Sequence, residues 1–538
     1  MNKLNIFLKN NYYLLTAVLM FLSFPSYDFV MLKFFPAVAW FSLIPLFSYI
    51  SGKSLRDVFF TTFITGLAGN LFTYGWIGNF GAKVPGGYIV ILLFLIPSLT
   101  AFFTIKIFLS EYLSQKFPDY KLFIYPSIWI IIDYVQSIGF LAFPWTYIGY
   151  SQYTFTSFVQ VVSITGILGV NFIIVIFNKV LSEFLNSFDN GVAGFNDILK
   201  NRYFRRVAAI SFLVIIITVS GFIRLSVNNN NGNGKTLKVA LVQSCISPWE
   251  NWSGNRYKYL AELMYYTKGA LQSNPDFIIW SESATLELIS FRALSGETDN
   301  FDEQLLGFVK ENGKPLLTGE IGLVVKKDSG RLRYYPQNNA VMISGAGEVL
   351  QTYPKINLVP FGEWFPYQKW FAPVKRLVES FGGSDFVPGN KPELFSVDGM
   401  KFCTLICYEG IFYRLCRDYR RMGADFMVNI TNDGWTDAYN GHYQHYSASI
   451  FRAVENGIWM VRAGNDGVTS IIDPKGRATA SLPILKKSFL TGEIDTSQNI
   501  ETFYSKYGDL ILYAAVLFII IIVSRSGFNS MREKRAKV

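Results

Sequence analysis

Cys407 is the residue of this sequence that is best placed to act as a nucleophile. It follows an apolar run from Lys401 to Ile406, and Glu409 lies two positions further on. The run predicts a buried strand with the thiol at its carboxyl end. A free thiol has a pKa of about 8.5 and needs activation at neutral pH. Because the chain has only two histidines, another group is expected to act as the base.

Two more ionisable residues stand next to predicted strands. Glu282 follows the apolar run 276–280, and Lys355 opens a proline-containing loop that ends at Glu363. A buried carboxyl group can take the thiol proton and return it, and a fixed ammonium group can stabilise an oxyanion. Glu282, Lys355 and Cys407 could therefore form a triad without histidine. Taken singly, the cysteine could equally be a buried core residue, and the two charges a salt bridge or solvated side chains.

The elements that must position these residues lie in a polar stretch of alternating strands and helices. Such alternation predicts an α/β domain. We expect strands over residues 237–243, 276–280, 315–324, 339–353, 401–408 and 424–431, a helix over 442–456, and strands around a turn over 459–473. The run 228–234 contains only Asn and Gly and predicts a flexible linker before this domain.

Apolar blocks occupy both ends of the chain. Charged residues make up 16% of it and its mean hydropathy is +0.26, which is unusual for a soluble protein. Blocks of about 20 apolar residues can cross a bilayer. We predict about eight spans, near residues 10–24, 34–50, 58–78, 87–105, 122–139, 158–178, 207–226 and 507–524. The first is expected to be an uncleaved span, because no signal-peptidase site follows it.

The lysines and arginines gather in alternate loops between these spans. The positive-inside rule then places both termini in the cytoplasm and the polar domain outside it. We assign to the cytoplasmic side Lys3, Lys9, Lys53, Arg56, Lys106, Lys116, Lys121, Lys179, Lys200, Arg202, Arg205, Arg206 and the basic residues after 524. The net charge of +10 mostly reflects this asymmetry, so we do not interpret it as a nucleic-acid-binding surface.

The resulting organisation has four parts. Residues 1–227 form a helical membrane domain of seven spans, and 228–236 form the linker. Residues 237–500 form the catalytic domain, and 501–538 form the last span with a basic cytoplasmic tail. The four cysteines all fall in the catalytic domain. Their spacing resembles neither a disulfide scaffold nor a zinc site.

Several strings of the sequence resemble one known family. They are 358–363 (Leu-Val-Pro-Phe-Gly-Glu), 407–409 (Cys-Tyr-Glu), 431–433 (Thr-Asn-Asp) with Trp435, 452–457 (Arg-Ala-Val-Glu-Asn-Gly) and 143–145 (Phe-Pro-Trp). They are similar to strings of the nitrilase superfamily and, within it, of the apolipoprotein N-acyltransferase family. The resemblance implies an αββα sandwich placed between seven spans and one.

The same resemblance implies roles for individual residues. Glu282 would be the base, Lys355 the stabiliser of the thiolate and the oxyanion, and Cys407 the nucleophile that carries the acyl group. Four further residues would support the site or bind substrate: Glu363, Tyr408, Glu409 and Trp252.

The activity implied is transfer of a fatty acyl chain, through a cysteine thioester, from a phospholipid to the α-amino group of the lipidated N-terminal cysteine of a lipoprotein. The implied location is the inner membrane of a bacterium, with the catalytic domain on the periplasmic side. The expected partners are a phospholipid donor, a diacylated lipoprotein acceptor and the bilayer, without nucleic acid, metal or organic cofactor. Two alternatives stay open: a membrane-anchored amidase or nitrilase, and a transporter or receptor whose outer domain only binds.

Three features outside the triad also allow more than one interpretation. Asp133 lies within a predicted span, where it could line an entrance for lipid with Gln136 and Trp145, or face the bundle or its hydrated end. His442 and His445 are spaced to share a metal, but a structural role is favoured because no third ligand is evident. The aromatic cluster that begins at Trp364 is expected to form a membrane-facing lid; its other members are Phe365, Tyr367, Trp370 and Phe371.

Overall fold

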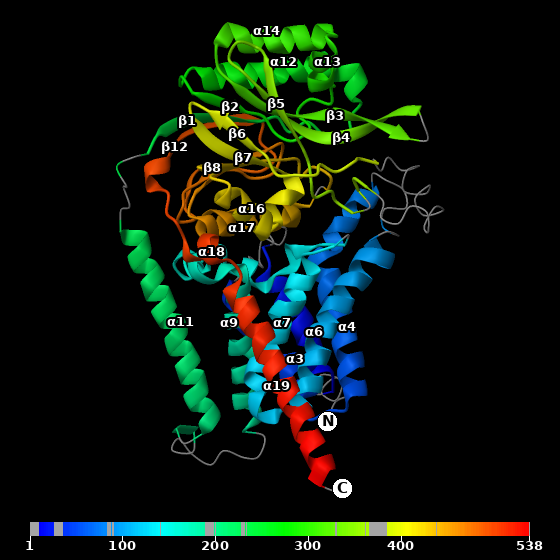
Figure 1. Ribbon diagram of the computed structural model, residues 1–538, viewed down its shortest axis with the longest axis vertical. Coiled ribbons are helices and arrows are strands. Elements are labelled where there is room, and N and C mark those ends of the chain that lie inside the picture. The colour runs from blue at the N-terminus through cyan, green and yellow to red at the C-terminus, as the bar shows by residue number, and fades with distance from the viewer. Residues whose placement is uncertain are drawn as a thin grey trace, which may run out of the picture. The chain divides into compact units, whose positions relative to one another are not determined.

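The chain divides into two compact units. Unit 1 comprises residues 1–76, 91–226 and 507–538, and unit 2 comprises residues 77–90 and 227–506. The computed structural model (Figure 1) describes residues 10–25, 36–82, 88, 91–139, 141–188, 198–199, 201–227, 232, 234–328, 331–360, 362–364, 385–436 and 438–536.

Unit 1 consists of apolar helices. Its main helices are α2 (Leu15–Ser23), α3 (Ile44–Ile50), α4 (Leu55–Tyr74), α6 (Ile96–Lys116), α7 (Lys121–Gln136), α9 (Val162–Asn186), α11 (Arg202–Ser226) and α19 (Leu510–Ala536). A helix therefore occurs within or beside each predicted span. By length and composition, the helices within Leu92–Lys116, Val162–Asn186 and Arg202–Ser226 can each cross a membrane. Shorter apolar helices cover Tyr12–Ser23, Pro36–Ile50 and Leu510–Arg525, so the count of eight spans stays a prediction.

Two lysines that the sequence analysis placed in cytoplasmic loops lie inside helices. Lys106 belongs to α6 and Lys179 to α9, and both side chains are buried. Each is paired with a carboxylate, Lys106 with Asp133 at 2.5 Å and Lys179 with Glu183 at 2.9 Å. Because pairing compensates much of the cost of burying a charge, the helices continue past these lysines. The assignment of both residues to loops was therefore wrong.

Unit 2 contains two six-stranded sheets. The first has the order β12-β1-β2-β3-β4-β5 and the second the order β11-β10-β9-β8-β7-β6. The strands are β1 (Thr236–Gln243), β2 (Phe277–Ile279), β3 (Leu316–Asp328), β4 (Arg331–Ile343), β5 (Val349–Pro354), β6 (Leu394–Val397), β7 (Met400–Ile406), β8 (Phe426–Thr431), β9 (Trp459–Gly464), β10 (Thr469–Ile472), β11 (Ala478–Leu482) and β12 (Ser488–Asp495). Contacts such as Phe277 on Phe402, with ring centroids 5.3 Å apart, join the two sheets.

Helices cover the outer face of each sheet, so unit 2 has four layers (Figure 1). The first sheet carries α12 (Trp252–Leu271), α13 (Ile289–Ser295) and α14 (Asn300–Asn312), and the second carries α16 (Tyr413–Arg421) and α17 (Tyr439–Asn456). A short helix, α18 (Phe503–Tyr507), follows the last strand. This is the αββα sandwich that the sequence resemblance implied.

Local sequence explains where these helices begin and end. Asn251 and Asp299 cap the N-termini of α12 and α14 with their side-chain oxygens. Gly313 and Gly457 end α14 and α17 in the left-handed conformation that glycine adopts most easily. The buried side of the first helical layer packs on the sheet through Val242, Leu260, Leu263, Ile278, Trp280, Phe301 and Leu305.

The predicted elements correspond to these strands and helices, but several bounds differ. β3 extends past residue 324 to Asp328, and β4 begins at Arg331 rather than at residue 339. The run 339–353 is not one strand, because a turn over 344–348 separates β4 from β5. The strand predicted over 401–408 ends at Ile406, and a short 3₁₀ helix, Cys407–Ile411, begins at the cysteine. The thiol therefore stands on a turn at the end of the strand.

Candidate active site

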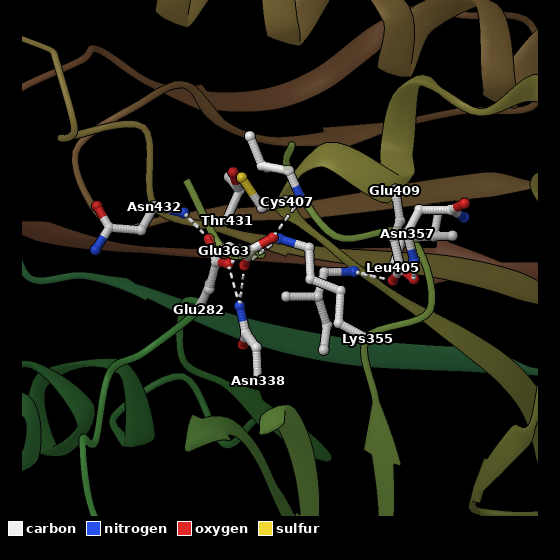
Figure 2. A network of polar contacts seen from close by, with 12 residues as sticks. Glu282, Asn338, Lys355, Asn357, Glu363, Leu405, Cys407, Glu409, Thr431 and Asn432 are labelled. Atoms are coloured by element: carbon white, nitrogen blue, oxygen red, sulfur yellow. Dashed lines mark hydrogen bonds and ion pairs between the residues drawn. The ribbon is translucent and has the colours of Figure 1, made fainter. Parts of the chain in front are cut away.

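The ends of strands from both sheets meet at one place in unit 2. Lys355 directly follows β5, and Glu282 lies on the turn after β2, both in the first sheet. Cys407 directly follows β7 in the second sheet. Figure 2 shows the three side chains converging on one another. The fold thus brings together the three residues that the sequence analysis singled out as a possible triad.

Lys355 lies between two carboxylates. Its Nζ donates to Oε1 of Glu363 at 2.8 Å and to Oε1 of Glu282 at 3.4 Å. Nδ2 of Asn338 donates to the same two oxygens, at 2.8 and 2.9 Å respectively. The side chain of Lys355 is 1% exposed and that of Glu282 is 4% exposed. At this burial the ammonium group is held in one position and cannot exchange its partners for water.

Glu282 is held by a backbone N–H group of another loop and by the packing of its own turn, as well as by Lys355. Its Oε2 accepts a hydrogen bond from the backbone N–H of Asn432 at 2.8 Å. The next residue, Ser283, has a φ of +51°, and the turn packs against Gly319 of β3 so closely that a Cβ there would lie 2.4 Å from Ser283 N. Burial raises the pKa of Glu282, Lys355 lowers it and Glu363 raises it, and the net direction is upward. Glu282 therefore holds a proton more readily than an ordinary glutamate.

Cys407 occupies a turn that is unfavourable for a residue with a side chain. Its φ is +49°, in the left-handed region, which costs about 1–2 kcal/mol for a residue other than glycine. Burial and Glu282 raise the pKa of the thiol, while Lys355 and a hydrogen bond with Thr431 lower it, and the pKa ends well above its usual range. The resting thiol is therefore neutral, and a base must take its proton during attack.

Glu363 and Glu409, which the resemblance assigned as supporting residues, each hold loops of the site. Oε2 of Glu363 accepts from the backbone N–H of Val359 at 2.8 Å. Oε1 of Glu409 accepts from the backbone N–H of Ile356 at 2.7 Å and of Asn357 at 3.1 Å, and its Oε2 accepts from that of Ile406 at 2.8 Å. Glu409 thus connects the loop that carries Lys355 to the strand that presents Cys407.

Tyr408 and Trp252 have different surroundings. Tyr408 is buried beside Cys407, and its ring packs edge-on against Phe412 with centroids 5.1 Å apart. Trp252 begins α12, where its indole N–H donates to Glu287 at 3.1 Å and its ring stacks on Tyr259 at 5.5 Å. These contacts place Trp252 in the packing of the outer helices. A substrate contact by Trp252 stays a prediction.

Sequence reasoning missed several polar residues that complete the site. Asn338 lies on β4 and belongs to no pattern that signals catalysis, whereas Asn432 follows β8 within the family string 431–433 but was assigned no role. Behind Cys407 lies a second group consisting of Asn429, Asp433, His445 and Arg462, which we call the buried polar ring. The string Thr431-Asn432-Asp433 and the spacing of His442 and His445 were the signals that could have pointed to part of it.

The two histidines of α17 do not face a common metal position. Nδ1 of His445 lies 2.7 Å from Asp433, whereas Nδ1 of His442 lies 3.9 Å from the same carboxylate. In the described part of the chain, Cys407, Asp433 and His445 have possible ligand atoms within 4.8 Å of one another. The Arg462 guanidinium already pairs with Asp433 at 2.7 Å and would repel a cation there. We therefore interpret the group as an ion-pair network.

Asp133, whose role the sequence left open, faces the interior of unit 1. Its Oδ1 pairs with Lys106, and its Oδ2 accepts from Nδ2 of Asn171 at 2.6 Å. Gln136 also accepts from Lys106, at 3.3 Å, and donates to Thr146 at 2.8 Å. Asp133 is fully buried. These contacts favour the bundle-facing interpretation over an entrance for lipid.

The aromatic cluster predicted to form a lid is described only at its start. Trp364 forms an isolated β-bridge with Pro360. Phe365, Tyr367, Trp370 and Phe371 lie outside the described residues.

Comparison with known proteins agrees with the fold of unit 2. Residues 238–503 match the family model for carbon-nitrogen hydrolases. An amidase from Nesterenkonia sp. superposes with a TM-score of 0.37 and 18% sequence identity, over 54% of this chain and 97% of the amidase. The family match and the two six-stranded sheets show that unit 2 is a nitrilase-type α/β domain.

The family match of the helical unit 1 indicates a more specific family than unit 2 alone does. Residues 16–180 match the model for the apolipoprotein N-acyltransferase N-terminal domain. The apolipoprotein N-acyltransferase of Geobacter metallireducens is 31% identical over 518 residues, which cover 93% of this chain and 92% of that protein. The one of Borreliella burgdorferi is 29% identical over 467 residues, or 85% of this chain and 84% of that protein. This chain belongs to the apolipoprotein N-acyltransferase family and is an acyltransferase with a membrane unit.

Proposed function

We propose that this enzyme transfers a fatty acyl chain from a membrane phospholipid to the α-amino group of a lipoprotein's lipidated N-terminal cysteine. The observation that carries the proposal is that buried Glu282 and Lys355 meet the partly buried Cys407, with the Lys355 ammonium group bonded to Glu282 and Glu363 and its charge acting on the thiol. The family membership supplies the substrate classes. The proposed sites of catalysis are these three residues, within a catalytic domain of residues 237–500.

The first half-reaction forms a thioester. Sγ of Cys407 attacks the ester carbonyl carbon of the phospholipid while Glu282 takes the thiol proton. The carbonyl oxygen becomes an oxyanion, which Lys355 stabilises together with backbone N–H groups. The carbon–oxygen ester bond then breaks, and Glu282 returns the proton to the departing alkoxide. The lysophospholipid leaves and the acyl chain stays on Sγ.

The second half-reaction forms the amide. The acceptor's amine attacks the thioester carbonyl, and Glu282 takes a proton from the amine. The carbon–sulfur bond breaks, and Cys407 recovers its proton from Glu282. The raised pKa of Glu282 suits this alternation, because a carboxyl group that holds a proton easily can both take it and return it.

A membrane location suits both substrates, because each is anchored in lipid. The apolar helices of unit 1 and the family membership support the inner membrane of a bacterium. We propose that the catalytic domain lies on the periplasmic side with both termini in the cytoplasm, on the basis of the lysine and arginine distribution. Acyl transfer also requires that water be excluded, since water would hydrolyse the thioester.

The alternatives are less well supported. An amidase would share the triad, but the solved amidase is only 18% identical to this chain and lacks a counterpart for almost half of it. A transporter or receptor whose outer domain only binds would not need the buried Glu282–Lys355 pair next to a thiol.

The decisive experiment is intact-protein mass spectrometry after incubation with a defined phospholipid. We expect one fatty-acyl adduct on the wild-type protein and none on Cys407→Ala. Cys245→Ala, which removes a partly exposed thiol outside the site, should keep the adduct. If Cys407→Ala still N-acylates a diacylated lipopeptide, the proposed mechanism is wrong.

A further inference from the structure

The buried polar ring behind Cys407 contains charged and polar groups that the proposed acyl-transfer steps do not use. Asn429 lies on β8, Asp433 follows that strand, His445 lies on α17 and Arg462 on β9. The side chains of His445 and Arg462 are 2% and 0% exposed, and that of Asp433 is 8% exposed. Four polar side chains from separate elements at this depth require an explanation, because each loses hydration on burial.

The ring has two arms that end at one atom. In the first arm, Nε2 of His445 lies 3.1 Å from the backbone carbonyl oxygen of Cys407, and its Nδ1 lies 2.7 Å from Oδ1 of Asp433. In the second, Nδ2 of Asn429 donates to the same carbonyl oxygen at 3.3 Å. The nucleophile's own peptide group is therefore held from two sides.

Arg462 joins the two arms. It donates to Oδ2 of Asp433 at 2.7 Å and to Oδ1 of Asn429 at 2.5 Å. A third bond, from its Nε to the carbonyl of Val468 at 3.1 Å, fixes the guanidinium plane. Burial would raise the pKa of Asp433, but Arg462 and His445 outweigh it and hold the pKa well below its usual range. The carboxylate is therefore charged and acts as a firm acceptor for His445.

The direction of this carbonyl matters for catalysis. A peptide group is planar and trans, so fixing the carbonyl of Cys407 also fixes the N–H of Tyr408, which points the opposite way. The backbone conformation of this turn is not stable by itself. Cys407 has a φ of +49°, and such a conformation persists only when the surrounding structure enforces it. A small rotation of this peptide would turn the N–H of Tyr408, whereas Sγ, which is attached through Cβ to the Cα of Cys407, would stay almost in place.

We propose that His445, Asp433, Arg462 and Asn429 are positioning residues that orient the Cys407–Tyr408 peptide for the tetrahedral intermediate. The ring acts through the peptide, and none of its members exchanges a proton with substrate. The N–H of Tyr408 is thereby presented to the oxyanion as a partner to Lys355. This inference rests on the proposed acyl transfer at Cys407.

The test compares two reactions of the same thiol. Acyl transfer to a diacylated lipopeptide passes through an oxyanion, whereas alkylation of Cys407 by iodoacetamide does not. For His445→Gln we expect kcat for acyl transfer to fall by about 100-fold, because loss of one hydrogen-bond donor to an oxyanion typically has that effect. The alkylation rate should change by less than about threefold, and the thermal unfolding midpoint should stay close to that of the wild type.

Two further variants distinguish a loss of positioning from a loss of folding. Asn429→Asp keeps the shape and the contact with Arg462 but loses the amide donor, so it should show the same split between acyl transfer and alkylation. His442→Gln removes the neighbouring histidine of the same helix, which is equally buried but is not seated on the Cys407 carbonyl. It should retain kcat within about threefold.

The outcomes separate the inference from the function on which it rests. Normal acyl transfer by both His445→Gln and Asn429→Asp would overturn the positioning role. A parallel loss of acyl transfer, alkylation and thermal stability would also overturn it, by showing that the ring only stabilises the fold. If the wild-type protein is alkylated at Cys407 but transfers no acyl chain, the proposed function has failed instead.

Discussion

Lys355 is held between two carboxylates, so the buried site contains more negative than positive charge when both are ionised. Glu363 raises the pKa of Glu282 through this proximity, and burial acts in the same direction. In the proposed mechanism, the proton that leaves Cys407 would therefore pass to a carboxylate with a raised pKa. At the scale of single residues, the supporting carboxylate Glu363 tunes the base as well as holding the lysine.

This arrangement predicts the pH dependence of Glu363→Gln. Glu282 must be ionised to accept the thiol proton, so activity falls as the pH drops through its pKa. Removing the charge of Glu363 lowers the pKa of Glu282, and the acidic limb of kcat/KM should move to lower pH. A pH profile of lipopeptide acylation measures this shift. The exposed Glu348→Gln should leave the limb in place, and a shift of the Glu363→Gln limb to higher pH would contradict the argument.

At the scale of helices and strands, each side chain of the proposed triad lies where a strand ends. The sequence pattern was sufficient to find Glu282, Lys355 and Cys407, since each adjoins an apolar run that forms a strand. It could not find the polar ring, because His445 and Arg462 lie 38 and 55 residues beyond Cys407 and meet it only through the packing of α17 and β9. Asn338 was missed for the same reason.

Close packing between two elements gives a second prediction. Gly319 of β3 touches the turn that carries Glu282, and a Cβ at this position would meet backbone atoms, which cannot move aside easily. Gly319→Ala should displace Glu282 and lower acyl transfer by about 100-fold. Gly307→Ala is the matched control, because nothing lies within 4 Å of its Cβ position. Steady-state acylation assays on both variants measure this effect, with circular dichroism to check the fold. Near-normal activity of Gly319→Ala would refute the predicted displacement of Glu282.

On the scale of the whole molecule, sequence predicted the division into an apolar helical part and an α/β part but misplaced charges within the helices. A hydropathy profile treats a lysine as a sign of a loop. Lys106 and Lys179 show why this fails here, since their partners Asp133 and Glu183 lie close by inside the same unit. The partner of Lys106 is on a different helix, and the apolar blocks alone give no sign of that pairing.

The Lys106–Asp133 pair predicts how unit 1 responds to mutation. Breaking a buried pair leaves an uncompensated charge and costs about 3–5 kcal/mol. Lys106→Met should therefore lower the thermal unfolding midpoint in detergent markedly, and adding Asp133→Leu should recover much of the loss. Lys116→Met, at the exposed end of the same helix, should have little effect. Equal midpoints for Lys106→Met and Lys116→Met would show that the pair does not hold the helices together.

The antiparallel pairing of β1 with β12 has a consequence for how this protein can be modified. Thr236 and Asp495 are partners in register, and the backbone N–H of Thr496 donates to the carbonyl of Lys235 at 2.9 Å. The polypeptide enters and leaves the sandwich within about one strand spacing, roughly 5 Å. The two ends of the segment that holds all twelve strands therefore lie next to each other. Exchanging this segment for a homologous one at residues 235 and 496 would keep that separation, but it would also have to preserve the bonds that Ile500 and Thr502 make to Gly457 and Glu455.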